Sequence, residues 1–195
     1  MNGTSAPEHM ASDLDALRTL YSLKRVERRG TVGDRFETTA EHVFSALVLA
    51  QFLLPRITPA LDELRVLKLL LVHDWVEAHA GDTFILDEEA RTMKKERERE
   101  AAQQLARELP PIVAQEYLAL NNEFVAGETR EARFARAIDR LDANVHSIDI
   151  PSDWTRNGFT EAKTRELVEP YLHDFPPLLA LFEEIIGELK RNKAL

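Results

Sequence analysis

The stretch LLLVHDWVEAHAGD, residues 69–82, decides how this sequence is interpreted. It opens with apolar residues and then places His73, Asp74, Glu77 and Asp82 close together. Residues three or four apart share one face of a helix, so Glu77 lies on the same side as His73 and Asp74. Carboxylates crowded into an apolar setting are unfavourable unless a cation compensates them. The stretch therefore predicts a site for a divalent ion at the polar end of a buried helix, and histidine with carboxylates suits Mn, Co, Fe, Zn or Mg.

Helical periodicity continues on both sides of this stretch, and no segment alternates as a half-buried strand would. Thr38 and Glu41 have the spacing of a capping box, which predicts a helix start. We expect an all-α fold of about seven to eight helices, with loops at KRVERRGTVGDR and SDWTRNGFT. The helices are expected at about 14–24, 38–54, 62–80, 87–109, 111–125, 129–149, 160–173 and 176–191. Residues 1–12 are predicted to form a flexible tail, and residues 13–195 a single domain.

Composition narrows the class of protein. With 195 residues, 44% of them hydrophobic and 30% charged, the chain is typical of a soluble globular protein. A net charge of −9 argues against binding of long nucleic acid through a basic face. Cysteine is absent, which excludes disulfides and thiolate chemistry and fits a cytoplasmic location. No apolar run approaches the ~20 residues of a membrane-spanning helix, so no membrane association is expected.

Two further positions complete a possible metal site. His42 lies just inside the capped start of the second helix, and Asp139 lies beside the apolar stripe of the sixth. Asp142 and His146 share that stripe, so either could take the place of Asp139. A lone histidine at a helix start is more often a satisfied core residue than a ligand. The order H…HD…D over three helices nevertheless favours a shared site.

These segments resemble a known family. AEH (40–42), HDWVEAHAGD (73–82) and AIDRLDANVH (137–146) are similar to the HD-domain metal-dependent phosphohydrolases, in particular to the 5′-deoxynucleotidase-like branch. The resemblance covers about residues 14–150 and implies an HD-domain helical bundle. It implies metal ligation by His42, His73, Asp74 and Asp139. Glu77 and Asp82 match the acidic pair that positions or activates water and protonates the leaving group, and Arg25 of LKR (23–25) matches a residue that contacts the substrate phosphate.

The sequence departs from this branch at two positions. Relatives often carry a tryptophan in the basic loop, where this chain has Val26 and Thr31. Selection for a 2′-deoxy sugar is therefore not implied, and Trp154 is the residue that could replace the missing ring. His79 matches no motif position, and we predict a structural role for it.

The function expected from these observations is metal-dependent hydrolysis of nucleoside 5′-monophosphates or similar small phosphomonoesters. One divalent ion would activate the water that attacks phosphorus. The resemblance also implies a homodimer. Two alternatives stay open: a metal- or nucleotide-binding HD regulatory module without catalysis, and a hydrolase of another phosphorylated or pyrophosphorylated nucleotide. The intact pair Glu77 and Asp82 favours an enzyme, since a binding module needs neither.

Overall fold

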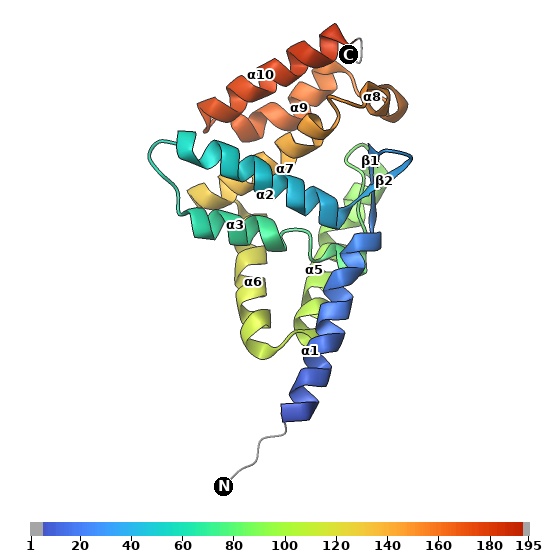
Figure 1. The fold of residues 1–195 in the computed structure, drawn as a ribbon, viewed down its shortest axis with the longest axis vertical. Helices are drawn as coiled ribbons and strands as arrows, with labels where there is room; N and C mark the ends of the chain where they lie inside the picture. Colours follow the sequence, from blue (N-terminus) through green and yellow to red (C-terminus); the bar gives the residue numbers. More distant parts are fainter. Residues whose placement is uncertain (1–5, 193–195) are drawn as a thin grey trace.

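The computed structural model describes residues 6–192, with side chains described for 12–87 and 92–192. Within this part of the chain the fold is a helical bundle with one small β-hairpin, so the expected all-α class is confirmed (Figure 1). The long helices are α1 (Ala6–Tyr21), α2 (Thr39–Leu53), α3 (Glu63–Val72), α5 (Glu88–Glu108), α6 (Pro111–Ala126), α7 (Arg130–His146), α9 (Glu161–Leu172) and α10 (Pro176–Arg191). Shorter elements are the 3₁₀ turns η1 (Ser22–Arg25) and η2 (Leu54–Arg56) and the helices α4 (Glu77–Ala80) and α8 (Pro151–Asn157).

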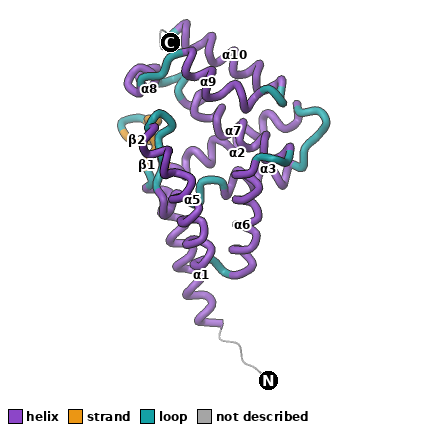
Figure 2. The backbone as a smooth tube through the Cα atoms, turned by 180° about the vertical axis from the view of Figure 1, so that it is seen from behind, coloured by secondary structure: helices purple, strands orange, loops and turns teal. Residues whose placement is uncertain are grey.

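Helix α7 lies at the centre of the bundle. It packs against α2 and α3 on one side and against α9 and α10 on the other (Figure 1; Figure 2). Its buried stripe contains Phe134, Ile138 and Leu141, which are fully buried. The Thr129 side chain begins this helix by accepting a hydrogen bond from the Ala132 amide. Helix α7 is amphipathic, and its packing against neighbours on several sides lets polar residues from α2, the end of α3 and α7 meet.

The start of α2 follows the sequence prediction. The Thr38 hydroxyl accepts from the Glu41 amide, and the Glu41 carboxylate accepts from the Thr38 amide, so the capping box is formed. This box fixes where the first turn begins. It places Thr39 and His42 on the inner side of the helix, and both are fully buried.

The single helix expected over 62–80 is a wrong prediction. Helix α3 ends at Val72, and α4 begins at Glu77 after a tight turn. In this turn the amides of Trp75 and Glu77 bond to carbonyls three residues back, those of Val72 and Asp74. The tighter winding turns the His73–Asp74 pair relative to α3. Gly81, with φ of 70°, ends α4.

The basic loop is also corrected, because much of it forms an antiparallel hairpin. Strand β1 (Glu27–Val32) pairs with β2 (Arg35–Thr38), with Thr31 opposite Phe36. Gly33, at φ of 62°, occupies the turn. The strands are short and mostly polar, and so gave no alternating apolar pattern.

Two smaller corrections concern the expected loop SDWTRNGFT and the expected N-terminal tail. Most of the expected loop SDWTRNGFT belongs to α8 (Pro151–Asn157), which is capped by Gly158 in the left-handed conformation. Helix α1 starts at Ala6, so residues 6–12 of the expected flexible tail are helical, and residues 1–5 lie outside the described chain. None of the helices in residues 6–192 combines the length and hydropathy that crossing a bilayer requires.

Candidate metal centre and active-site pocket

Side chains from three helical segments converge at one point. His42 comes from α2, His73 follows α3, and Asp139 comes from α7; one ligand atom from each lies within 4.8 Å of the others. Asp139 Oδ1 is 3.1 Å from His42 Nε2 and 3.6 Å from His73 Nε2. Asp74 Oδ2 is 3.1 Å from His73 Nε2 and 3.7 Å from His42 Nε2. The four predicted ligands therefore form one cluster.

Both histidines are oriented by their other ring nitrogen. His42 Nδ1 lies 2.9 Å from Asp142 Oδ2, and His73 Nδ1 lies 2.7 Å from the Leu70 carbonyl oxygen. A carbonyl only accepts, so His73 Nδ1 carries the hydrogen and Nε2 offers a lone pair to the cluster. His73 Nε2 is buried and makes no hydrogen bond within the described chain. A divalent ion among these nitrogen and carboxylate donors would satisfy that atom, so the residues fit the ion that the pattern implies.

The charges of the cluster support each other. Burial on its own would lower the pKa of His42, but hydrogen bonds to Asp139 and Asp142 outweigh it and raise the pKa to about 9. Burial would raise the pKa of Asp74, but the neighbouring His73 holds that pKa below its ordinary value. The Asp74 carboxylate is thus held in the ionised form that binds a cation, and a metal ion at His42 would take the place of the proton that its raised pKa favours.

Glu77 and Asp82 lie beside this cluster. Glu77 is the first residue of α4, and its Oε2 accepts a 2.6 Å hydrogen bond from the buried Thr39 hydroxyl. Burial, followed by the charge of Asp74, raises the pKa of Glu77 to about 8. Asp82 follows Gly81 and lines the same pocket. One carboxyl group that titrates near neutral pH thus lies close to a second carboxyl group, an arrangement suited to proton transfer.

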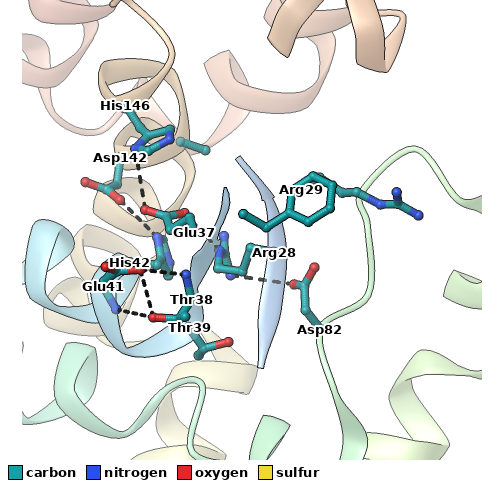
Figure 3. Close-up of polar contacts among 12 residues, drawn as sticks. Arg28, Arg29, Glu37, Thr38, Thr39, Glu41, His42, Asp82, Asp142 and His146 are labelled. Atoms are coloured by element: carbon teal, nitrogen blue, oxygen red, sulfur yellow. Dashed lines mark hydrogen bonds and ion pairs between the residues drawn. The ribbon is translucent and has the colours of Figure 1, made fainter. Parts of the chain in front are cut away.

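Arg28, Arg29 and Arg140 line the pocket, and Arg28 is the one that contacts the acids, whereas the sequence favoured Arg25 over the other arginines of the basic loop as the phosphate-binding residue. Arg28 extends from β1, with Nη1 3.4 Å from Asp74 Oδ2 and 3.6 Å from Asp82 Oδ1, as Figure 3 shows for Asp82. Arg25, the residue predicted to bind phosphate, is exposed at the end of η1 and does not line the pocket. The hairpin explains the difference, because it carries Arg28 inward while Arg25 precedes it.

A cavity of about 170 Å³ connects these groups to a less polar region. One part is lined by the acids and Arg28, and the other by residues of α8, α9 and the segment after α4. The second part includes Phe84, Trp154, Phe159, Leu167 and Val168. The pocket is therefore amphiphilic, with charged groups at the metal cluster and aromatic and aliphatic groups elsewhere.

Residues 20–171 match the family described as HD domain. This chain belongs to the HD domain family. It is 33% identical to 5′-deoxynucleotidase HDDC2 of Bos taurus and 31% identical to the Homo sapiens protein of the same name, each over 93% of this chain and 87–88% of the relative. The crystal structure of a predicted metal-dependent phosphohydrolase from Magnetospirillum magnetotacticum superposes with a TM-score of 0.87, at 36% identity over 98% of both chains. The expected resemblance is confirmed, and the chain is a hydrolase of this family.

Glu37 and His146 of this HD domain support Arg28; Glu37 was missed, and His146 was predicted only as a possible substitute for Asp139. Glu37 of β2 is buried, with Oε2 3.5 Å from Arg28 Nε and Oε1 3.5 Å from His146 Nδ1 (Figure 3). Burial raises the pKa of Glu37. His146 Nε2 in turn bonds the Thr31 carbonyl at 3.0 Å. Neither His146 nor Asp142 replaces Asp139 at the centre, because Asp142 lies behind His42 and His146 faces the hairpin.

The remaining candidates lie outside the metal cluster. His79 Nε2 is 3.2 Å from Glu108 Oε1, so it packs α4 of the HD domain against α5. Thr31 donates from its amide and hydroxyl to Asp153 at 2.7 Å each, which ties β1 to α8. Trp154, next to Asp153, is buried and lines the pocket. Thr31 and Asp153 are 122 residues apart in the sequence, so no local sequence pattern predicts their contact.

Proposed function

We propose that this protein hydrolyses nucleoside 5′-monophosphates or similar small phosphomonoesters with one bound divalent ion. The observation that carries the proposal is the meeting of His42, His73, Asp74 and Asp139 in a pocket that also holds Glu77 and Asp82. The similarity to 5′-deoxynucleotidases supports the substrate class.

The ion would bind through His42, His73, Asp74 and Asp139; when bound, such an ion lowers the pKa of its water and polarises a phosphoryl oxygen. Glu77 exchanges a proton near neutral pH, since its pKa is about 8, and the Thr39 hydroxyl holds its carboxyl in place. We assign the transfer of protons to and from water and the leaving oxygen to Glu77 and Asp82. We assign them this role because both carboxylates lie beside the four proposed metal ligands, and the ligand set is complete without them.

We propose Arg28, rather than Arg25, as the residue that holds the substrate phosphate. Its contacts to Asp74, Asp82 and Glu37 are 3.4–3.6 Å long, longer than ordinary N–H···O hydrogen bonds. The guanidinium therefore keeps donor capacity for an anion that enters the pocket. A planar group with several donors suits phosphate oxygens.

We also propose that the protein is a homodimer in which α2 faces a second copy. Phe44, Val48 and Phe52 follow one another at four-residue spacing on α2 and are all exposed, the two phenylalanines to about 70%. A contiguous exposed apolar stripe is typical of an interaction surface. Sedimentation velocity of the wild type and of Phe52→Glu tests this: a dimer that Phe52→Glu dissociates is expected, and a wild-type monomer contradicts it. The cytoplasmic location stays a prediction.

The deciding experiment is a substrate screen with phosphate release as the readout. Metal-free protein is supplied in turn with Mn, Co, Fe, Zn and Mg and offered nucleoside mono-, di- and triphosphates and simple phosphomonoesters. We expect monophosphates to be hydrolysed only with metal, and Glu77→Gln to remove the activity while it keeps the metal. Hydrolysis restricted to di- or triphosphates would replace the proposed substrate, and binding without turnover under all metals would favour a regulatory module.

A further inference from the structure

One buried carboxylate beside Arg28 has no part in the chemistry proposed so far. Glu37 of β2 is 4% exposed, and its two oxygens face different partners (Figure 3). Oε2 lies 3.5 Å from Arg28 Nε, and Oε1 lies 3.5 Å from His146 Nδ1. The Nε edge of the guanidinium therefore faces Glu37, while Nη1 faces Asp74 and Asp82. A buried carboxylate needs such partners to offset its lost hydration.

His146 connects this carboxylate to the end of the central helix. It is the last residue of α7, and its Nε2 lies 3.0 Å from the Thr31 carbonyl oxygen. A carbonyl only accepts, so Nε2 carries a hydrogen and donates it. That bond fixes the ring with Nδ1 directed at Glu37. Because α7 also carries Asp139, one helix supports both the metal cluster and the hairpin that carries Arg28.

The hairpin makes room for this arrangement at Gly30. Gly30 lies two residues after Arg28 in β1, and both line the pocket together with Glu37 and His146. A Cβ at Gly30 would lie 3.0 Å from His146 Nε2 and 3.4 Å from Glu37 Oε2, which is tighter than most Cβ contacts. The absence of a side chain at Gly30 thus lets Glu37 and His146 approach the strand beside Arg28.

We propose that Glu37, held in place by His146, is a positioning residue that orients the guanidinium of Arg28 toward the substrate phosphate. The inference rests on the proposed function of Arg28 and adds a residue that acts through it. A carboxylate repels phosphate, so the charge of Glu37 alone would oppose substrate binding. Its benefit comes from the ion pair that holds one edge of the guanidinium and leaves the opposite edge for the anion.

Glu37→Gln separates orientation from charge, because glutamine keeps the size of the side chain and removes the charge. If Glu37 acted on the phosphate only by repulsion, this variant would bind phosphate more tightly. If Glu37 orients Arg28, it binds phosphate more weakly, because the guanidinium loses its ionic partner. Glu27→Gln, at an exposed position of the same hairpin, is the matched control for the loss of one negative charge. Elemental analysis and thermal unfolding check that each variant keeps its metal and its fold.

The measurements are kcat/KM for 2′-deoxyadenosine 5′-monophosphate and the inhibition constant of inorganic phosphate. We expect Glu37→Gln to lower kcat/KM about three- to twelvefold and to weaken phosphate inhibition by a similar factor, the scale of one hydrogen bond. Glu27→Gln should change neither quantity by more than about twofold. The double variant with Arg28→Ala and Glu37→Gln should be no worse than Arg28→Ala alone, since both changes remove the same interaction with phosphate.

Unchanged or tighter phosphate inhibition in folded Glu37→Gln overturns the inference. Losses that multiply in the double variant also overturn it, because Glu37 would then act independently of Arg28. If Glu37→Gln does not fold, His146→Gln decides instead, since glutamine can still donate to the Thr31 carbonyl but loses the contact with Glu37. Weaker phosphate inhibition in His146→Gln supports the positioning role, and wild-type inhibition contradicts it.

Failure of the proposed function can be told apart from failure of this inference. If no phosphomonoester is hydrolysed, binding of inorganic phosphate to the metal-loaded proteins is measured by calorimetry. Binding that Arg28→Ala and Glu37→Gln both weaken, and Glu27→Gln does not, supports the positioning role without hydrolysis. Binding that Arg28→Ala weakens and Glu37→Gln leaves unchanged overturns the role of Glu37 alone. Absent binding, or binding that Arg28→Ala does not weaken, overturns the phosphate site and the inference together.

Discussion

Removal of the Asp142 carboxylate should weaken metal binding although Asp142 is not a ligand. Its Oδ2 is 2.9 Å from His42 Nδ1, and Asp142 is almost fully buried. Asp142→Ala leaves a buried N–H without an acceptor and frees the ring to turn. A hydrogen bond to a charged group contributes about 1.5–3 kcal/mol, or about 13- to 160-fold in Kd. Outer partners of metal-binding histidines show a similar effect, about 10- to 100-fold.

The assay is competition for Mn, Co or Zn against a chromophoric chelator at fixed pH, with circular dichroism to show that the variant is folded. Asp142→Asn keeps an acceptor oxygen without the charge and should lie between the wild type and Asp142→Ala, about fivefold weaker than the wild type. Asp149→Ala, at an exposed position a short distance along the chain, is the control. A folded Asp142→Ala protein that binds metal within twofold of the wild type would refute the orienting role.

His73→Ala should lose the metal in elemental analysis and lose metal-dependent thermal stabilisation, about 4 kcal/mol at a thousandfold excess over Kd. Glu77→Gln should lower turnover about 10²- to 10⁴-fold with the metal retained. Because burial raises the pKa of Glu77 to about 8, the native state keeps a proton that the unfolded state releases between pH 4.5 and 8. Metal-free wild type should thus lose stability to urea as pH rises through this window, and Glu77→Gln should lose less. Arg28→Ala should depress kcat/KM ten- to hundredfold without loss of metal, and Arg25→Ala should have little effect.

Each of these outcomes has a contrary result. Metal retained in full by His73→Ala removes it from the ligand set. Wild-type turnover in Glu77→Gln would contradict a catalytic role for Glu77. If the stability of both metal-free proteins to urea changed equally with pH, Glu77 would not hold the extra proton inferred for the native state. A larger effect of Arg25→Ala than of Arg28→Ala would restore the original assignment of the phosphate site.

Much of the fold follows from local signals in the sequence. The Thr38–Glu41 capping box predicted a helix start that the structure confirms, and the prolines at 110 and 111 and the glycines at 81 and 127 lie at helix ends. These signals act within one or two turns of the chain, so they do not depend on the rest of the molecule. The hairpin at 27–38 and helix α8 were missed because their residues are polar, and their stability comes from partners far away in sequence.

The break after Val72 shows that local sequence signals can also miss a turn within a predicted helix. An apolar run followed by a terminating glycine predicts one continuous helix, yet tight bonds to carbonyls three residues back divide it. In the folded chain, this turn lies where His73 and Asp74 approach residues of other helices. Their side chains must meet His42 and Asp139 from other helices, and sequence periodicity carries no information on that requirement.

The sequence alone predicted the all-α class, and its resemblance to the HD-domain family implied the residues proposed as metal ligands, His42, His73, Asp74 and Asp139. Only the tertiary structure decided which groups surround them. Arg28 replaced Arg25 in the pocket because of the hairpin, and Asp142 proved to orient His42. The physical reason is that periodicity and caps report contacts within a few residues, whereas hydrogen bonds and charge pairing in a pocket join segments 100 or more residues apart, such as His42 and Asp142.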